Sequence, residues 1–345
     1  MSTLSTAINK QVRLAARPVG LPTRANWDFT SEAVQEPAAG GVLVKTLSLS
    51  LDPAMRGWMN DGKSYIPPVG IGEVMRAGGI GVVVASKNPA FAVGDHVYAS
   101  LGVQTYCLIA ESEFKRAGLV KIDTRAAAPT QWLNVLGMPG MTAYFGLMDV
   151  GLPKAGETLV VSGAAGAVGQ TVGQLGKILG LRVVGIAGGQ AKCDWVVREL
   201  GFDACVDYKA GKVKESLREL CPKGVDIYFD NVGGDILDTV LTRINKKARI
   251  IICGAISQYN NTTPVKGPAN YLSLLVNRAR MEGIVVFDYA DRYPQAVAEL
   301  AGYLKAARMK SKEDVVEGLD TFPETLQKLF NGENFGKLVL QVASE

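Results

Sequence analysis

A glycine-rich turn between a short apolar run and a helical segment is the feature that most constrains how this chain can fold. The run Leu159-Val160-Val161-Ser162 suits a buried parallel strand, and Gly163-Ala164-Ala165-Gly166-Ala167-Val168-Gly169 follows it directly. A helical segment over 170–179 and a β-rich run over 182–187 come next. This order of strand, turn, helix and strand within about thirty residues predicts the opening of a Rossmann unit.

The same alternation continues toward the C-terminus. Helices are predicted over 192–200, 213–221 and 236–244, and strands around 205–208 and over 225–229, 249–253 and 283–287. Strands that alternate with helices are typical of an α/β fold, so we expect a doubly wound parallel sheet of about six strands.

The chain on either side of this region has a different texture. Residues 1 to 130 hold short β-rich runs such as 41–45, 80–84 and 95–98, separated by Gly, Pro and Asp turns. Two helices, over 293–307 and 323–330, and an alternating strand over 337–342 are predicted after the Rossmann region. We therefore expect a β-rich domain over 1–130, a Rossmann domain over 131–300 and a return to the first domain over 301–345, with a cleft at the junction.

The glycine turn departs modestly from the usual dinucleotide fingerprint. Ala164 stands where the first glycine would be, while Gly166 and Gly169 occupy the second and third positions. The second glycine lets the backbone approach a pyrophosphate and the third lets helix pack on strand. A glycine-rich packing turn is the alternative, but the surrounding strand and helix pattern favours dinucleotide binding.

The residues after the second strand indicate which dinucleotide binds. NAD enzymes carry Asp or Glu about 20 residues past the glycine turn, but 187–192 contains no carboxylate. Gly188 and Gly189 leave room for a 2′-phosphate, and Lys192 would place a positive charge near it. NADP(H) is therefore favoured over NAD(H), unless Lys192 is only a solvated lysine at a helix start.

Composition excludes several other classes. The net charge of +4 is spread along the chain without a basic stripe, so nucleic acid is a poor candidate partner. No uncharged apolar stretch reaches about 18 residues, so no membrane span is expected. The single histidine, His96, lies beside a Gly-Asp turn and is interpreted as structural, and without a Cys-x-x-Cys pair no zinc site can be assembled. Widely spaced cysteines and an N-terminus without an apolar signal favour a cytoplasmic protein with reduced thiols.

Five segments are distinctive in combination, namely Leu51-Asp52-Pro53-Ala54-Met55-Arg56-Gly57-Trp58-Met59, Leu136-Gly137-Met138-Pro139-Gly140-Met141-Thr142-Ala143-Tyr144, Phe229-Asp230-Asn231-Val232-Gly233-Gly234, Cys253-Gly254-Ala255-Ile256-Ser257-Gln258-Tyr259-Asn260 and Asn334-Phe335-Gly336-Lys337. Through them nearly the whole chain resembles the zinc-independent medium-chain dehydrogenase/reductases. The most similar branch is that of the NADPH-dependent double-bond reductases, which includes prostaglandin reductases, leukotriene dehydrogenases, plant alkenal reductases and bacterial curcumin reductases. The resemblance implies a GroES-like catalytic domain over 1–130, NADPH as cofactor and a homodimer.

The resemblance also implies roles for individual residues. Those matching the pyrophosphate turn are Ala165, Gly166, Ala167, Val168 and Gly169. Lys192 and Tyr208 match residues that hold the 2′-phosphate, and the backbone near Phe287 would meet the nicotinamide carboxamide. The other implied cofactor contacts are Gly188, Asn231, Cys253, Ser257 and Asn334. Tyr259 matches the catalytic tyrosine, while Arg56 and Tyr65 match substrate-pocket residues. Ala54 replaces an aromatic residue of many relatives, which puts the pocket's shape in doubt.

The chemistry of such a reaction gives Tyr259 a role. Hydride addition to the β-carbon of an α,β-unsaturated carbonyl compound places negative charge on the carbonyl oxygen, where a hydrogen-bond donor is needed. A tyrosine hydroxyl stays protonated near neutrality. Tyr259 would otherwise be a packing aromatic, and Arg56 would be either a receptor for a substrate carboxylate or a structural arginine. Quinone reduction and a non-enzymatic NADPH-binding role are the alternative functions.

Overall fold

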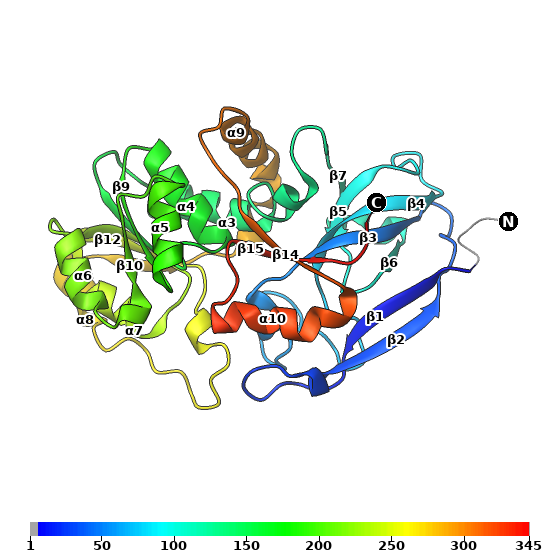
Figure 1. Ribbon diagram of the computed structural model, residues 1–345, viewed down its shortest axis with the longest axis horizontal. Helices are drawn as coiled ribbons and strands as arrows, with labels where there is room; N and C mark the ends of the chain where they lie inside the picture. The colour runs from blue at the N-terminus through cyan, green and yellow to red at the C-terminus, as the bar shows by residue number, and fades with distance from the viewer. Residues whose placement is uncertain (1–5, 345) are drawn as a thin grey trace. The chain divides into compact units, whose positions relative to one another are not determined.

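A computed structural model describes residues 6–344, and it divides into two units (Figure 1). Unit 1 comprises the described residues up to Leu133 together with those from Glu313 onward, and unit 2 spans Asn134–Lys312. Within 6–344 no helix combines the length and the apolar character that crossing a lipid bilayer would require.

Unit 2 is built on a six-stranded sheet in which every neighbouring pair of strands is parallel. The strands are β8 (Thr158–Ser162), β9 (Arg182–Ala187), β10 (Ala204–Asp207), β11 (Val225–Asp230), β12 (Ile244–Ile252) and β13 (Arg280–Gly283). Their spatial order is β10-β9-β8-β11-β12-β13. This is the 3-2-1-4-5-6 order of a Rossmann fold, so the prediction of a doubly wound α/β sheet is confirmed.

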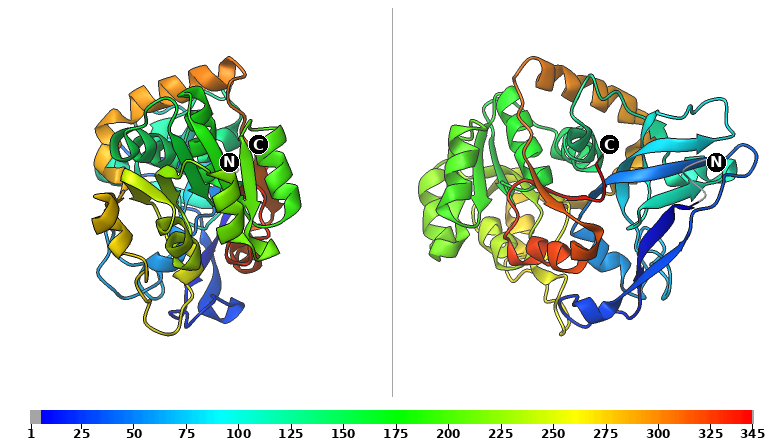
Figure 2. Two further views of the ribbon diagram at one scale, coloured as in Figure 1. Left: turned by 90° about the vertical axis from the view of Figure 1, so that its left-hand side faces the viewer. Right: turned by 45° about the vertical axis from the view of Figure 1, so that its right-hand side comes forward.

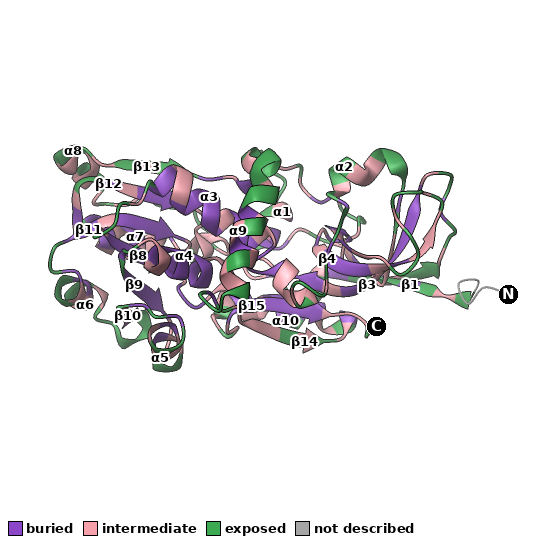
Figure 3. Ribbon diagram, turned by 90° about the horizontal axis from the view of Figure 1, so that it is seen from above, coloured by how far each residue is buried: buried purple, intermediate pink, exposed green. Residues whose placement is uncertain are grey.

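Helices connect the strands of this sheet and cover it. The connecting helices are α4 (Ala167–Ile178), α5 (Gln190–Arg198), α6 (Val213–Leu220), α7 (Gly234–Leu241) and α8 (Leu272–Asn277). Helix α3 (Met138–Phe145) precedes the first strand of the sheet, and α9 (Tyr293–Lys305) follows the last. The central strand β8 is buried along its whole length, whereas α6 and α8 keep exposed faces (Figure 3). Helix α4 packs closely against Phe202 because Gly173 has no side chain. A Cβ at Gly173 would lie 1.8 Å from Cζ of Phe202.

Three predicted boundaries in this unit are wrong. The last strand lies at Arg280–Gly283 rather than over 283–287, and Val286–Arg292 forms a short 3-10 helix. The apolar residues Ile284 and Val286 are only 9% exposed, so side-chain packing buries them without pairing in a strand. Helix α7 ends at Leu241 rather than at residue 244. Strand β12 begins at Ile244 rather than at residue 249, because Ile244 pairs with Val225 of β11.

Unit 1 contains a separate sheet of mixed strand directions and a two-stranded hairpin. The hairpin consists of β1 (Ile8–Leu14) and β2 (Trp27–Ala33). The sheet contains β3 (Val42–Ser50), β4 (Gly78–Ser86), β5 (His96–Ser100), β6 (Tyr106–Ile109), β7 (Val120–Lys121), β14 (Glu313–Glu317) and β15 (Lys337–Gln341). Its order is β14-β15-β3-β4-β5-β7, with β6 also paired to β3. The short helices α1 (Ala54–Trp58) and α2 (Phe114–Ala117) and the longer α10 (Phe322–Asn331) complete the unit.

The C-terminal strand of unit 1 joins segments that are far apart in the sequence. β15 pairs antiparallel with β3, with Val339 opposite Ser50 and Leu340 opposite Leu49. The right-hand view of Figure 2 shows the red C-terminal strand beside the blue β3. At this junction the buried Lys337 donates from Nζ to the backbone oxygen of Leu51 at 2.7 Å and to Oδ1 of Asp52 at 2.6 Å. Two segments that carry the family resemblance are therefore in direct contact.

Candidate functional site

The cofactor residues predicted in unit 2 are gathered along one edge of the parallel sheet. The turn 163–169 follows β8, Gly188 and Lys192 follow β9, and Tyr208 follows β10. Asn231 follows β11, and the segment 253–259 follows β12. Carboxyl ends of parallel strands lie at the same edge, and the order of this sheet reverses between β8 and β11, where Rossmann folds bind ligands. The structure therefore places these residues along the edge at which Rossmann folds bind ligands.

The tight turn after β8 depends on Gly163, which the fingerprint comparison did not single out. Gly163 has φ +61°, in the left-handed region that glycine adopts without strain. Ala164 is fully buried and its backbone N–H donates to the oxygen of Ile186 at 3.1 Å. Its methyl group packs at Gly185, where a Cβ would lie 2.9 Å away. Alanine is therefore accommodated at the first fingerprint position because the preceding glycine makes the turn.

The remaining glycines of this turn keep the backbone accessible. Gly166 is the N-cap of α4 and makes no side-chain cap hydrogen bond. At Gly169 a Cβ would lie 2.2 Å from the backbone oxygen of Gly163, so no larger residue fits. The N-terminus of this 12-residue helix presents backbone N–H groups and the positive end of the helix dipole. This arrangement fits the pyrophosphate of a dinucleotide.

A second loop, between β9 and α5, has the features expected around a 2′-phosphate. Gly188 lies directly against Tyr208, because a Cβ on Gly188 would be 2.7 Å from the tyrosine hydroxyl oxygen. Lys192 lies in the first turn of α5 and is half-buried. Asp207, which the sequence did not single out, accepts hydrogen bonds at Oδ1 from the backbone N–H of Gly189 at 2.8 Å and of Lys209 at 2.9 Å. Its carboxylate therefore shapes the loop.

A buried carboxylate organises the next part of the edge. Asp230 is 1% exposed, and its Oδ1 accepts from the hydroxyls of Ser162 at 3.0 Å and Tyr228 at 2.8 Å. The backbone N–H groups of Val232 and Gly233 donate to the same oxygen at 3.0 and 2.9 Å. Burial raises the pKa of Asp230 above its ordinary value, although these hydrogen bonds oppose the shift. Sequence reasoning missed this residue, although it adjoins Asn231 in one of the distinctive segments.

Asp230 fixes the backbone from which Asn231 projects. The Asn231 N–H donates to Oγ of Ser162 at 3.0 Å, and its side-chain amide donates to the backbone oxygen of Ser162 at 2.7 Å. Cys253 is tied to the same point, since its N–H donates to the backbone oxygen of Asp230 at 2.9 Å. Burial raises the pKa of the Cys253 thiol to about 12, so it is neutral near physiological pH. This shift disfavours the thiolate that a nucleophilic cysteine needs.

Tyr259 is held at the same edge by contacts with its own loop. Its hydroxyl oxygen accepts from the backbone N–H of Ala255 at 3.1 Å, and a Cβ on Gly254 would lie 2.8 Å from that oxygen. Ser257 donates from Oγ to the backbone oxygen of Val232 at 2.6 Å, which joins this loop to the Asn231 loop. Phe287 follows β13 and is 41% exposed.

The predicted residues of unit 1 have different environments. Arg56 on α1 is 4% exposed and donates to the backbone oxygens of Gly20 at 3.1 Å and Pro18 at 3.2 Å. It also donates to Oδ1 of Asn60 at 2.6 Å. These are the contacts expected of a structural arginine. Tyr65 is 56% exposed, and Asn334 donates from its side chain to the backbone oxygen of Gly336 at 2.9 Å.

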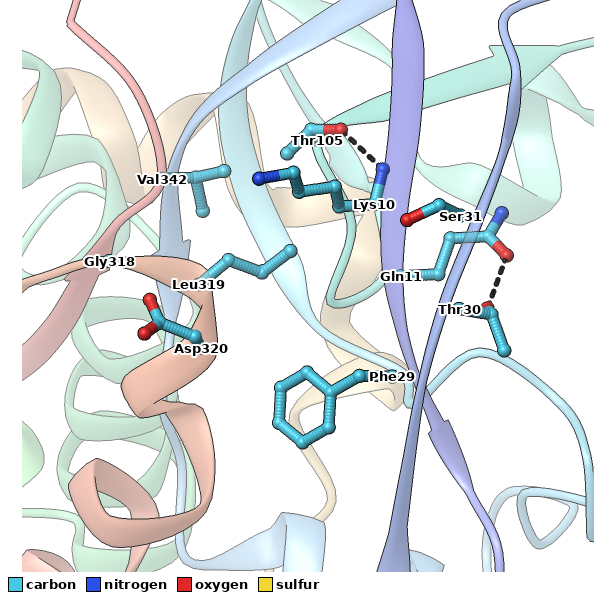
Figure 4. Close-up of a pocket in the computed structure, with 10 residues that line it drawn as sticks. All are labelled: Lys10, Gln11, Phe29, Thr30, Ser31, Thr105, Gly318, Leu319, Asp320 and Val342. Atoms are coloured by element: carbon cyan, nitrogen blue, oxygen red, sulfur yellow. Dashed lines mark hydrogen bonds between the residues drawn. The ribbon is translucent and has the colours of Figure 1, made fainter.

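A separate open pocket lies in unit 1 between the β1–β2 hairpin and the turn that precedes α10 (Figure 4). Its volume is about 510 Å³, and its lining includes Lys10, Phe29 and Asp320. None of the residues predicted to bind cofactor or substrate lines it. Among residues 6–344 no group of three or more His, Cys, Asp and Glu side chains is placed to hold a metal ion.

Comparisons with known proteins match both units. Residues 10–117 match a family model described as the N-terminal domain of oxidoreductase, and residues 167–302 match one described as zinc-binding dehydrogenase. The NADPH-dependent curcumin reductase of Escherichia coli is 43% identical, over 98% of both chains. The NADP(+)-dependent 2-alkenal reductase of Nicotiana tabacum is 39% identical, also over 98% of both. The crystal structure of CurA from Vibrio vulnificus in complex with NADPH is 44% identical, with a TM-score of 0.91 over 97% of this chain and all of that one.

Proposed function

Because this chain belongs to the zinc-independent medium-chain dehydrogenase/reductases, in the branch of NADPH-dependent double-bond reductases, we propose that it reduces the carbon-carbon double bond of α,β-unsaturated ketones and aldehydes. Curcumin-type compounds and alkenals are the proposed substrates, as the names of the relatives indicate. The observation that carries the proposal is the position of Tyr259 at the carboxyl edge that also bears the pyrophosphate turn and the predicted 2′-phosphate loop.

NADPH is the cofactor, and when bound it supplies the hydride. The backbone N–H groups at the start of α4 would hold its pyrophosphate, while Lys192 and Tyr208 would hold its 2′-phosphate beside Gly188. The backbone near Phe287 would orient the nicotinamide, and Asn231 and Asn334 are proposed as further cofactor contacts. Contacts of Lys192 and Tyr208 with this phosphate would give the enzyme its preference for NADPH over NADH.

The chain's own contribution to the chemical step comes from Tyr259. Negative charge develops on the carbonyl oxygen of the substrate as its β-carbon accepts hydride, and the Tyr259 hydroxyl donates a hydrogen bond to that oxygen. The N–H of Ala255 fixes the hydroxyl in position, so little reorganisation is needed when the charge develops. Solvent then supplies the proton to the α-carbon.

We assign direct contact with the substrate to Tyr65. Arg56 acts indirectly, through the backbone segments that its guanidinium holds. Tyr65 is exposed enough to contact an aromatic or aliphatic substrate. The guanidinium of Arg56 is buried against two backbone oxygens and Asn60, which supports a role in shaping the pocket wall rather than in binding a substrate carboxylate.

The experiment that tests this function follows the absorbance of the reduced nicotinamide with purified protein. NADPH and NADH are each offered with an aliphatic enone, curcumin and a simple quinone. Consumption of NADPH with both enones, together with a product that has lost its carbon-carbon double bond and kept its carbonyl group, is the expected result. Turnover with the quinone alone would make the protein a quinone reductase, and NADPH binding without turnover of any compound would make it a binding protein.

The proposal extends to assembly and location. A homodimer is supported by the edge strand β13 and by α8 with its N-cap residue Tyr271, because Tyr271, Leu272, Leu275 and Val276 are each more than half exposed. Such a cluster of exposed apolar side chains is typical of an interaction surface. A cytoplasmic location is supported by the five cysteines, all of which are free thiols.

A further inference from the structure

Two cysteine side chains of unit 2 touch each other beside the predicted 2′-phosphate loop. Cys193 lies on α5 and Cys205 on β10, and their Sγ atoms are 2.7 Å apart, with Cys205 as the donor. Both are free thiols. This separation is well inside the sum of two sulfur van der Waals radii, so the two thiols pack directly against each other. By contrast, Cys221 of the same unit lies in a cluster of apolar side chains.

The surroundings of the pair differ on its two sides. Cys193 is 3% exposed, whereas Cys205 is only partly buried and lies on β10, an edge strand of the sheet. Of the two residues, Cys205 is therefore the one with surface toward solvent. Helix α5 and strand β10 lie side by side (Figure 1).

The thiol contact also makes one of the two sulfurs the better nucleophile. The S–H of Cys205 donates to the sulfur of Cys193, which lowers the pKa of Cys193, while the same bond and burial raise the pKa of Cys205. A thiolate is the reactive form of cysteine, so the first oxidation is favoured at Cys193. The second thiol is then already in contact with the oxidised sulfur.

We propose that Cys193 and Cys205 form a reversible disulfide when the protein meets a hydroperoxide, which cross-links α5 to β10 next to the NADPH-binding loop. The Cys193 thiolate attacks one peroxide oxygen and breaks the O–O bond, giving a sulfenic acid and, from hydrogen peroxide, one water. The Cys205 sulfur then attacks that sulfur, and the hydroxyl leaves as a second water. In total two thiols lose two electrons and two protons, and one hydrogen peroxide is reduced to two waters.

The disulfide would join the two elements that present the predicted 2′-phosphate residues. Lys192 immediately precedes Cys193, and Tyr208 follows Cys205 by three positions. The next step rests on the proposed function, which places the 2′-phosphate of NADPH beside Lys192 and Tyr208. The negative charge of that phosphate disfavours a thiolate at Cys193. Bound NADPH should therefore slow the oxidation more than bound NADH does, because the added negative charge raises the pKa of the Cys193 thiol.

The test begins with the reduced full-length protein without nucleotide. The protein is treated with hydrogen peroxide, quenched with excess alkylating reagent under denaturing conditions, and digested for mass spectrometry. We expect a linked peptide pair containing Cys193 and Cys205, alkylation of the other three cysteines, and full reversal by dithiothreitol. Retention of five alkylated cysteines, or oxidation of Cys205 to sulfinic acid without a cross-link, would overturn the proposal.

Three variants provide the controls. Cys193→Ser and Cys205→Ser should each abolish the cross-link. NADPH binding by each variant in its reduced state, measured by fluorescence titration, should equal that of the reduced wild-type protein. Cys221→Ala removes a buried thiol of the same unit and should leave the cross-link intact. Loss of the cross-link in Cys221→Ala would overturn the assignment of the pair. Because these readouts need no substrate, they are independent of whether the protein reduces enones.

The nucleotide arm repeats the oxidation with saturating NADPH or NADH in place of the apo protein. Slower cross-linking with NADPH than with NADH supports the coupling to the 2′-phosphate loop. Equal rates at confirmed saturation would overturn that coupling and would also count against the placement of the 2′-phosphate beside Lys192. The disulfide itself is decided by the peptide map alone.

Discussion

Tyr259 depends on a neighbouring residue that takes no part in the chemistry. The hydroxyl lies where a Cβ on Gly254 would come within 2.8 Å, closer than non-bonded atoms allow. We predict that Gly254→Ala displaces this hydroxyl and lowers kcat toward that of Tyr259→Phe, for which the loss of one donor corresponds to about 100-fold or more. The KM for NADPH should stay close to that of the wild-type protein.

Gly267 offers a matched control for this prediction, because a Cβ there would meet no atom within 4 Å. Steady-state kinetics with one enone should show wild-type kcat for Gly267→Ala. Wild-type kcat for Tyr259→Phe would remove the hydroxyl from the mechanism, and unchanged kcat for Gly254→Ala alone would show that the loop relaxes around a methyl group.

Lys192 provides a prediction about cofactor choice. A charge-assisted hydrogen bond to a phosphate contributes about 1.5–3 kcal/mol, so Lys192→Ala should raise the KM for NADPH by about 10-fold to 100-fold. The KM for NADH should change little, because NADH has no 2′-phosphate. Lys214→Ala, which removes an exposed lysine from α6, serves as the control for net charge. A similar loss with both nucleotides would contradict a specific contact to the 2′-phosphate.

The buried carboxylate of Asp230 predicts a pH dependence of stability. Burial raises the pKa of Asp230 above its ordinary value of 3.8. At a pH between 3.8 and this raised pKa, the folded protein therefore holds a proton that the unfolded chain has lost. The stability that this proton contributes is present at acidic pH and is lost as the pH rises through the folded pKa. Relative to Asp230→Asn, the wild-type free energy of unfolding should therefore fall as the pH rises from about 4.

Urea unfolding of both proteins at several pH values measures this difference. The exposed Asp235, in the first turn of α7, gives the control variant Asp235→Asn, whose difference from wild type should lack this fall. A difference for Asp230→Asn that is constant or rises with pH would show that the carboxylate is not protonated preferentially in the fold.

Some of these site residues could be predicted from the sequence, and others could not. Lys192 could be singled out because it follows a predicted strand, and Tyr208 through the family resemblance. Parallel strands place their carboxyl ends at one edge, which accounts for both residues lying along it. Asp230 follows a strand too, but its role depends on the two backbone N–H groups that the turn at Val232 and Gly233 directs to it. The left-handed φ of Gly163 likewise belongs to the folded backbone.

At the scale of elements, apolar runs predicted strands well where strands are buried on both sides. β8 and β11 lie where the sequence places them, because central strands of a parallel sheet are continuously apolar. β13 did not match its prediction because it is an edge strand with charged residues, Arg280 and Glu282. The apolar residues that follow it are buried by packing instead, and the sequence pattern does not distinguish these two ways of burying a side chain.

The contact between β15 and the end of β3 carries a prediction about stability. Lys337 is 1% exposed in its side chain, and Asp52 is 25% exposed. Burial lowers the pKa of Lys337 while Asp52 opposes that shift, so the ammonium depends on its partner. Lys337→Met leaves the Asp52 carboxylate and the Leu51 oxygen without this donor and should lower the free energy of unfolding by about 3 kcal/mol, the low end for breaking a buried pair.

The comparison is with an exposed ion pair of the same unit. Lys121 contacts Asp95 at 2.7 Å with half of its side chain exposed, so Lys121→Met should cost less than about 1 kcal/mol. Equilibrium unfolding of the two variants measures the contrast. Equal, small losses would mean that β15 is held to β3 by strand pairing alone.

At the scale of the whole molecule, the exposed apolar side chains of α8 predict an assembly. α8 packs on β12, and its outward residues Leu275 and Val276 are 73% and 66% exposed. The neighbouring strand β13 is at the edge of the sheet, so the backbone N–H and C=O groups along one of its sides have no strand partner in the sheet. In a symmetric dimer the same surface of a second copy would cover both features.

Leu275→Asp should therefore convert a dimer to a monomer, because it places a carboxylate in the centre of an apolar contact where it cannot be solvated. Light scattering coupled to size-exclusion chromatography gives the mass of each variant directly. Val265→Asp introduces the same charge at a residue of unit 2 that is 55% exposed but lies outside α8, and it should remain dimeric. A monomeric wild-type protein, or equal masses for wild type and Leu275→Asp, would mean that α8 and β13 do not form the interface. NADPH binding by the monomer should persist, since every residue assigned to the cofactor in unit 2 belongs to the carboxyl edge of a single chain.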